Sequence, residues 1–262
     1  EASLLLTLQQ QMSSEKYLFL NHGRFTVEVD ERPCAGAVQN KKEQQLPKVK
    51  LSDPQFGSSV VALLRKHSYA LVENPSDLSD TVSCVLEDQS PKVFTLVSGG
   101  RKAANISVDS ERTAALPNLA DTILEAVFVE VFGRDPFQIR RDLSPCFSAT
   151  KGCQGEPSTA SLLTAFQCPS AHEFINTEDH IDRGLITLAL SDKNDGLQVF
   201  DTAEDEWTNV ETAGWTVLMA GELLSFAAPG LFTPCRHRVI SLPSLRTSLT
   251  YKVRPSRDWV VR

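Results

Sequence analysis

The chain has 262 residues, which at ~150 residues per domain corresponds to fewer than two domains or to one large β domain. Apolar residues make up 41% and charged residues 23%, as in ordinary soluble globular proteins. The net charge of −7 and the pI of about 5.3 argue against nucleic acid and anionic membranes as partners, because both bind basic surfaces.

Residues 1–46 are predicted to be an N-terminal hairpin followed by a mobile linker. Two apolar, alternating segments flank Asn21-His-Gly-Arg, a sequence typical of a four-residue hairpin turn. Residues 31–46 are polar and predict the linker. The apolar residues near the start follow no basic segment, and no apolar run approaches the ~18 residues of a membrane span. We therefore expect neither a signal peptide nor a membrane-spanning segment.

The rest of the first half is predicted to mix short strands with helices. Alternation and apolar periodicity predict strands at 47–52, 69–73 and 94–98, and helices over about 60–66, 77–87 and 116–133. The last helix carries the clearest apolar stripe, from Leu119 to Val131, and Gly133 is a typical residue to end it.

From residue 160 onward, short apolar runs are separated by Gly, Pro, Asn and Asp, a pattern typical of a β-barrel or sandwich. The predicted strands are 161–168, 184–190, 196–200, 215–219, 223–226, 236–241 and 247–253. We therefore predict a mainly β protein with flanking helices, in which a mixed first half packs on an all-β second half. His67 is expected at a helix end, and the acidic run 201–206 is expected to be a solvated loop.

Three residues form a candidate metal site. His180 and Asp182 are two apart in an extended segment, so their side chains can point to the same side and share one ion. His237 lies far along the chain, on a different predicted strand, and supplies a third ligand. Two imidazoles and one carboxylate leave three coordination positions open, which suits a non-haem Fe(II) that binds a co-substrate and O₂ together.

Arg246 and Ser248 are a candidate pair for holding a carboxylate. They are also two apart on a predicted strand, so a guanidinium and a hydroxyl face the same way. An HxD, a His in a strand or an Arg-x-Ser is each common by itself. Their order and spacing within a run of short strands is far more specific.

The sequence His180-Ile-Asp-Arg-Gly-Leu-Ile-Thr-Leu, followed by Gly196-Leu-Gln-Val-Phe, resembles the signature of the Fe(II)- and 2-oxoglutarate-dependent oxygenases. Val217-Leu-Met-Ala-Gly-Glu, Cys235-Arg-His-Arg-Val and Leu245-Arg-Thr-Ser extend the resemblance, which is greatest to the isopenicillin N synthase-like branch. It implies a single oxygenase domain over 47–262, with a double-stranded β-helix (jelly-roll) core at about 160–255. It also implies that His180, Asp182 and His237 bind Fe(II).

The same resemblance implies that 2-oxoglutarate chelates the iron, with its other carboxylate on Arg246 and Ser248, and it allows ascorbate as a further cofactor. O₂ and a small organic substrate would be the other partners. Hydroxylation, desaturation and ring closure remain open, and the sequence defines neither the substrate nor the oligomeric state. Phe166 stands where the family usually has a Tyr that helps to hold the co-substrate, so one hydroxyl donor is missing.

Two alternatives remain open at this point. An oxidase of the same branch would use Fe(II) and O₂ without 2-oxoglutarate, and the missing hydroxyl at Phe166 favours this alternative. A non-catalytic barrel would only bind a ligand. A third idea, a Cys/His metal site at Cys235, lacks a CxxC partner.

Six scattered cysteines without a CxxC are expected to be free thiols in a reducing, cytoplasmic environment, which also suits an Fe(II) protein. Although the whole chain is acidic, the site is expected to be locally cationic, with Arg246 and Arg238 near the metal.

Overall fold

The computed structural model describes residues 46–75, 78, 95–96, 101–106, 111–133, 161–168, 175–191, 196–210, 212 and 214–254. The N-terminal hairpin and linker predicted over 1–46 and most of the predicted helix 77–87 lie outside this part. The helices are α2 (Phe56–His67), α4 (Glu111–Phe132) and α6 (Glu222–Ala227). The first-half strands are β1 (Lys48–Val49), β2 (Tyr69–Glu73), β3 (Thr95–Leu96) and β4 (Lys102–Ile106). The second-half strands are β5 (Leu162–Cys168), β6 (Ile175–His180), β7 (Ile186–Ser191), β8 (Leu197–Asp201), β9 (Glu206–Asn209), β10 (Trp215–Ala220), β11 (His237–Ile240) and β12 (Arg246–Val253).

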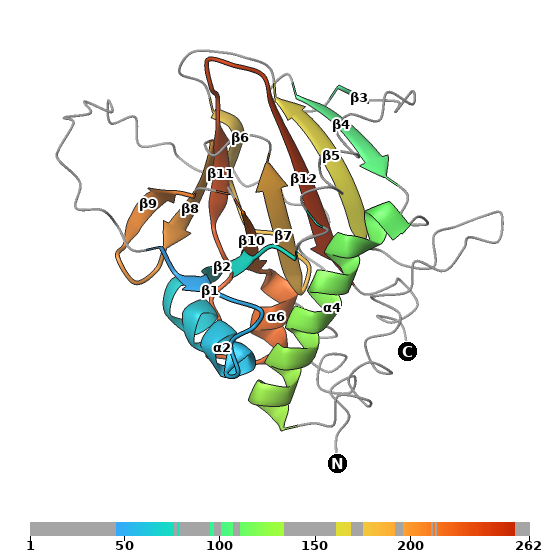
Figure 1. Ribbon diagram of the computed structural model, residues 1–262. Helices are drawn as coiled ribbons and strands as arrows, with labels where there is room; N and C mark the ends of the chain where they lie inside the picture. Colours follow the sequence, from blue (N-terminus) through green and yellow to red (C-terminus); the bar gives the residue numbers. More distant parts are fainter. Residues whose placement is uncertain are drawn as a thin grey trace, which may run out of the picture.

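The described strands form two facing sheets (Figure 1). The larger sheet has the order β1-β2-β10-β7-β12-β5-β4-β3, and the smaller has the order β6-β11-β8-β9. The predicted division into two packed halves is therefore wrong in one respect. The first-half strands extend both edges of the larger sheet, so both halves of the chain build one sheet.

The larger sheet has two distinct faces because alternate residues of a strand point to opposite sides. In β12, Leu249, Tyr251 and Val253 are buried in the apolar core beneath the helices. The residues that alternate with them point the other way and line a cavity between the sheets: Arg246, Ser248, Thr250 and Lys252. One strand thus supplies both the packing core and the polar lining of a site.

Helices α2 and α4 contact each other and cover the outer face of the larger sheet (Figure 1). Ile123, Leu124 and Phe128 of α4 are fully buried there. Each such side chain contributes roughly 1.5–3 kcal/mol to folding. α4 begins at Glu111, earlier than the apolar stripe predicts, and contains Pro117. Proline has no backbone N–H to donate, so one helical hydrogen bond is missing there.

Several other expectations need correction. The predicted strand 223–226 is wrong, since these residues belong to α6, whose Leu223 and Leu224 are buried in the core. A short apolar run does not by itself distinguish a strand from a buried helix. The polar strands β6 and β9 were not predicted, because their residues show little apolar alternation.

The acidic run 201–206 is not entirely a solvated loop. Asp201 is only 2% exposed, and its carboxylate accepts hydrogen bonds from His67 Nδ1 at 2.8 Å and from Tyr69 Oη at 3.3 Å. His67 does end α2, but it is buried against Asp201. This pair ties the end of α2 to the end of β8. No helix in the described ranges is long and apolar enough to cross a membrane.

Candidate metal centre

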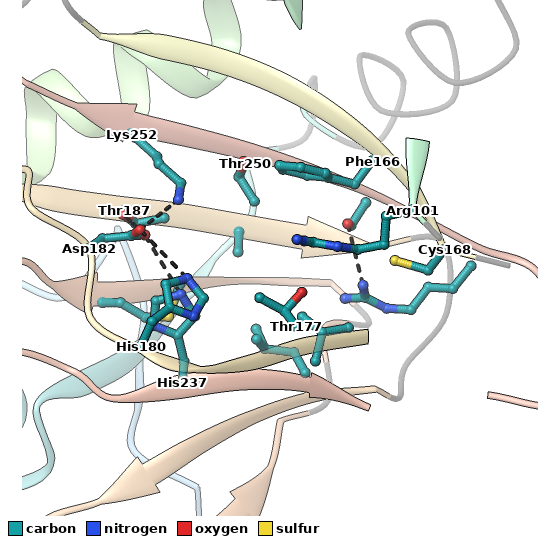
Figure 2. A pocket seen from close by; sticks show the side chains of 16 residues that line it. Arg101, Phe166, Cys168, Thr177, His180, Asp182, Thr187, His237, Thr250 and Lys252 are labelled. Carbon is teal, nitrogen blue, oxygen red and sulfur yellow. Dashed lines mark hydrogen bonds and ion pairs between the residues drawn. The ribbon is translucent and has the colours of Figure 1, made fainter. Parts of the chain in front are cut away.

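His180, Asp182 and His237 meet at one end of the cavity between the sheets (Figure 2). His180 ends β6, His237 begins β11, and the two are directly opposed in the β6–β11 pairing. Asp182 follows β6 by two residues. One ligand atom from each residue lies within 4.8 Å of the others. The Nε2 atoms of His180 and His237 are 3.9 and 3.7 Å from the Asp182 carboxylate oxygens. Two ligands of one ion lie roughly 3–4 Å apart, so the cluster could hold a metal ion.

Backbone carbonyls orient both imidazoles. His180 Nδ1 donates to the carbonyl of Glu178 at 2.8 Å, and His237 Nδ1 donates to the carbonyl of Cys235 at 3.2 Å. A proton on Nδ1 leaves the lone pair on Nε2, the atom that faces Asp182. Burial, partly offset by Asp182, lowers the pKa of His237 to about 4. His237 is therefore neutral near pH 7, as a metal ligand must be.

The Asp182 carboxylate has a hydrogen-bond partner on each oxygen. Lys252 Nζ lies 2.6 Å from Oδ1, and Thr187 Oγ1 donates to Oδ2 at 2.6 Å. Burial would raise the pKa of Asp182, but the Lys252 charge, His237 and these hydrogen bonds outweigh burial and lower it to about 2. Asp182 is thus ionised over the whole physiological range.

The loop that carries Asp182 is fixed by close backbone packing. The amide of Glu222 donates to the carbonyl of Asp182 at 2.8 Å. A side chain on the neighbouring Gly221 would come within 2.0 Å of the Gly184 carbonyl oxygen, so only glycine fits there. The turn after β10 therefore supports the ligand loop directly.

Arg246 and Ser248 lie along β12 on the face that lines the cavity, and they are 4% and 5% exposed. Arg246 Nη1 donates to Ser248 Oγ at 3.3 Å, so the two predicted carboxylate-binding groups are adjacent. Phe166 of β5 pairs with Ser248 across the sheet and lines the same cavity. The structure thus brings together all six site residues predicted from the sequence: His180, Asp182, His237, Arg246, Ser248 and Phe166.

Sequence reasoning missed five polar residues of the cavity, of which Arg101, Thr187 and Lys252 matter most here; the other two are Thr177 and Thr250. Lys252 could have been found by continuing the alternation of Arg246 and Ser248 along the strand, since position 252 falls on the same face. Arg101 gives no local signal, because its position depends on β4 pairing with β5.

Arg238 does not belong to this site. Its Nε donates to Gln198 Oε1 at 2.7 Å, and its guanidinium lies 4.2 Å from the centre of the Trp207 ring. It alternates with His237 and Val239, which line the cavity, and so lies on the other face of β11. The expected local positive charge comes from Arg246, as predicted, and from Arg101 and Lys252 in place of Arg238.

Cys235 does not join the metal cluster. It is fully buried in the apolar core between the sheets. Burial raises the pKa of its thiol to about 12, so it remains neutral. Cys168 and Cys235 are free thiols, and the other four cysteines lie outside the described residues.

Two facing sheets around two histidines and one carboxylate define a jelly-roll protein with a candidate mononuclear metal site. Residues 159–255 match the family model of the 2OG-Fe(II) oxygenase superfamily. The match covers the part of the chain that carries the metal cluster and the Arg246–Ser248 pair, and the jelly-roll fold expected from the resemblance is confirmed.

A 1-aminocyclopropane-1-carboxylate oxidase homolog of Solanum lycopersicum is 25% identical over 234 residues, 87% of this chain. The chain spans 59% of the length of that relative. Among solved structures, the fold is similar to full-length Neurospora crassa T7H in complex with alpha-KG and 5-formyluracil. The TM-score is 0.61 at 14% identity, covering 80% of this chain and 84% of that one. It is also similar to JOX2 in complex with 2OG, Fe and JA, with a TM-score of 0.60 at 16% identity, covering 81% of this chain and 75% of that one.

Proposed function

We propose that this protein is an Fe(II)- and 2-oxoglutarate-dependent oxygenase that hydroxylates, desaturates or cyclises a small organic molecule, releasing succinate and CO₂. One observation carries the proposal: the His180–Asp182–His237 cluster and the Arg246–Ser248 pair line one cavity. A metal site and a carboxylate site in the same cavity suit a co-substrate that bridges them. The T7H and JOX2 structures hold alpha-KG and 2OG, respectively.

The donor set fits iron. Two neutral imidazoles and one ionised carboxylate favour a divalent first-row metal and leave coordination positions for other ligands. Bound Fe(II) would supply O₂ activation coupled to oxidative decarboxylation of 2-oxoglutarate. Lys252 and Thr187 hold the Asp182 carboxylate in place.

Arg246 and Ser248 would bind the remote carboxylate of 2-oxoglutarate through charge-assisted hydrogen bonds. Both side chains are buried, so water competes weakly for that carboxylate. The cavity has a volume of about 230 Å³ and also contains apolar side chains such as Leu197 and Val239. These side chains would exclude water and contact the carbon skeleton of the substrate.

Succinate formation tests this function. The full chain, supplied with Fe(II), 2-oxoglutarate and O₂, should release succinate, and His180→Ala should abolish the release together with iron retention. Ile181→Ala is the matched control, because Ile181 is exposed between the two ligand positions. Undiminished succinate formation by His180→Ala would contradict the assignment.

Phe166 favours a second candidate, an oxidase that uses Fe(II) and O₂ without 2-oxoglutarate, as does the name of the tomato relative. Under anaerobic conditions, 2-oxoglutarate added to the Fe(II)-loaded protein should produce the weak visible charge-transfer band of the chelate. Absence of this band would favour the oxidase.

Residues 47–262 would form a single oxygenase domain, in which β1 to β4, α2 and α4 support the jelly-roll core. The protein would work in the cytoplasm, where reducing conditions preserve Fe(II) and free thiols such as Cys168 and Cys235. Ascorbate would serve as a further reductant, and nucleic acid and membranes would not be partners.

A further inference from the structure

Arg101 is a cavity-lining cation for which the proposed function has no role. It directly precedes β4, at the edge of the larger sheet opposite β1 and β2. Its neighbours on β4 pair with β5, with Lys102 opposite Gln167 and Ala103 opposite Phe166. Continuing this register by one residue places Arg101 opposite Cys168, which in turn pairs with Arg246. The two arginines therefore reach the same cavity from opposite sides of β5.

The side chain of Arg101 is held in a defined orientation. Its guanidinium carbon lies 5.3 Å from the centre of the Phe166 ring, a cation–π contact. Figure 2 shows the guanidinium lying beneath Phe166 and extending along the cavity toward His180 and His237. Stacking on a ring face leaves the edge of the guanidinium plane, where its donors are, directed sideways into the cavity.

The charges of the described cavity residues leave room for a second anion. Arg101, Arg246 and Lys252 are positive, and Asp182 is negative. With a divalent metal and a dianionic co-substrate bound, this lining would still carry two more positive than negative charges. Lys252 is hydrogen-bonded to Asp182, and Arg246 is hydrogen-bonded to Ser248 at the proposed co-substrate site. Burial lowers the pKa of Arg101, and the desolvation responsible would be offset by a bound anion.

We propose that Arg101 determines substrate specificity by binding the carboxylate of a small organic acid, which is the substrate proper and not the co-substrate. A planar guanidinium recognises a carboxylate through two parallel hydrogen bonds. Arg101 is more exposed than Arg246, which suits a ligand that binds after the co-substrate. This inference rests on the proposed function and names the substrate class of the same site.

Two binding measurements on the full chain, loaded anaerobically with Mn(II), separate the inference from the proposed function. The first titrates 2-oxoglutarate by calorimetry, and binding to the wild type tests the proposed function. The second, with 2-oxoglutarate present, uses ligand-observed NMR on pairs of small organic acids and their neutral amides, such as phenylacetate with phenylacetamide and hexanoate with hexanamide. We expect acids to bind and their amides to bind at least tenfold more weakly.

Arg101→Gln should weaken acid binding at least tenfold while changing 2-oxoglutarate affinity less than about twofold. Arg246→Gln should instead lose 2-oxoglutarate. Lys102→Gln is the matched control, because it removes a neighbouring positive charge from the opposite, exposed side of β4 and should change neither measurement. Arg101→Lys, which keeps the charge but loses the planar fork, should bind acids with intermediate affinity and serves if Arg101→Gln does not fold.

Four results would overturn the inference. If acids and their amides bind equally, the cavity does not recognise the negative charge of the substrate. If acid binding is unchanged in both Arg101→Gln and Arg101→Lys, Arg101 does not bind the acid. If 2-oxoglutarate binds but none of the acids does, the substrate is not a small organic acid. A loss of 2-oxoglutarate binding in Arg101→Gln as large as in Arg246→Gln would likewise overturn it, by assigning Arg101 to the co-substrate.

Discussion

The ammonium group of Lys252 lies 2.6 Å from Asp182 Oδ1, so the carboxylate at the candidate metal site already has a cationic partner. Both side chains are largely buried: that of Asp182 is 7% exposed and that of Lys252 is 20% exposed. In the metal-free protein Lys252 therefore balances a charge that would otherwise be buried alone. A bound metal would take over part of this role.

Lys252→Met should consequently destabilise the metal-free protein, by about 2 kcal/mol, because Asp182 loses its partner in a buried environment. Added Mn(II) should then raise the melting temperature more in the variant than in the wild type, since the metal replaces the missing charge. Thermal unfolding with EDTA and with Mn(II) measures both effects. Lys50→Met, on an exposed residue, is the control. A smaller metal-induced shift in Lys252→Met than in the wild type would contradict a charge-balancing role for Lys252.

Thr187→Val keeps nearly the same side-chain shape. It should weaken metal binding about tenfold, because Asp182 Oδ2 loses the hydrogen bond that orients it. Mn(II) or Co(II) affinity gives the measurement. Thr216→Val is the control, because it removes a similar hydrogen bond, 2.7 Å to Asn74 Oδ1. Thr216 does not line the cavity, so metal affinity should not change. Equal affinities in the two variants would show that Thr187 does not orient the ligand.

Phe166→Tyr should strengthen 2-oxoglutarate binding about fivefold, the effect of one added hydrogen bond worth about 1 kcal/mol. Phe166 pairs with Ser248, so a hydroxyl at this position would face the carboxylate proposed to bind there. Anaerobic titration of the Fe(II) protein with 2-oxoglutarate measures the change. Phe200→Tyr, which adds the same hydroxyl beside Trp207, should have no effect. If Phe166→Tyr binds 2-oxoglutarate no better, the carboxylate does not lie beside this strand pair.

Asp201→Ala should lower the free energy of unfolding by about 2–4 kcal/mol, because His67 and Tyr69 lose their shared buried acceptor. Metal affinity should change little, since this cluster shares no residue with the metal cluster. Urea unfolding measures the loss. Asp205→Asn is the control, because it alters an exposed residue whose positive φ asparagine tolerates. A loss below 0.5 kcal/mol would show that the pair contributes nothing net.

The metal-free protein should lose stability as the pH falls from 7.5 to 5. His237 has a pKa lowered to about 4 in the folded state, against 6.5 when unfolded. Below pH 6.5 the unfolded chain therefore binds a proton that the folded chain does not, and stability falls until the pH reaches about 4. Asp182, with its pKa lowered to about 2, contributes little within this window.

Urea unfolding in EDTA at pH 7.5 and 5 measures this effect. The wild type should lose about 1–2 kcal/mol more than His237→Gln, which lacks the titrating group. Equal losses in the two proteins would mean that His237 is not buried in its neutral form.

The sequence by itself determined most strands of the second half of the chain and the residues of the candidate metal and carboxylate sites. Short apolar runs bounded by turn residues predicted β5, β7, β8, β10, β11 and β12 close to their observed bounds, because a strand of either sheet buries apolar side chains and the turns between strands do not. The order of His180, Asp182, His237, Arg246 and Ser248 predicted which side chains meet. Residues two apart on a strand share a face, so short spacings carry geometric information without a structure.

Only the tertiary structure decided what depends on the pairing of distant segments. Leu223 and Leu224 form a helix because that helix fits the core beneath the sheet, which no pattern of four residues reveals. Asp201 is buried because His67, 134 positions away, supplies its partner. Arg101 enters the cavity because β4 pairs with β5, and Arg238 leaves it because it alternates with His237. Local patterns specify faces of strands, but the contacts across sheets and between layers form only when the whole chain folds.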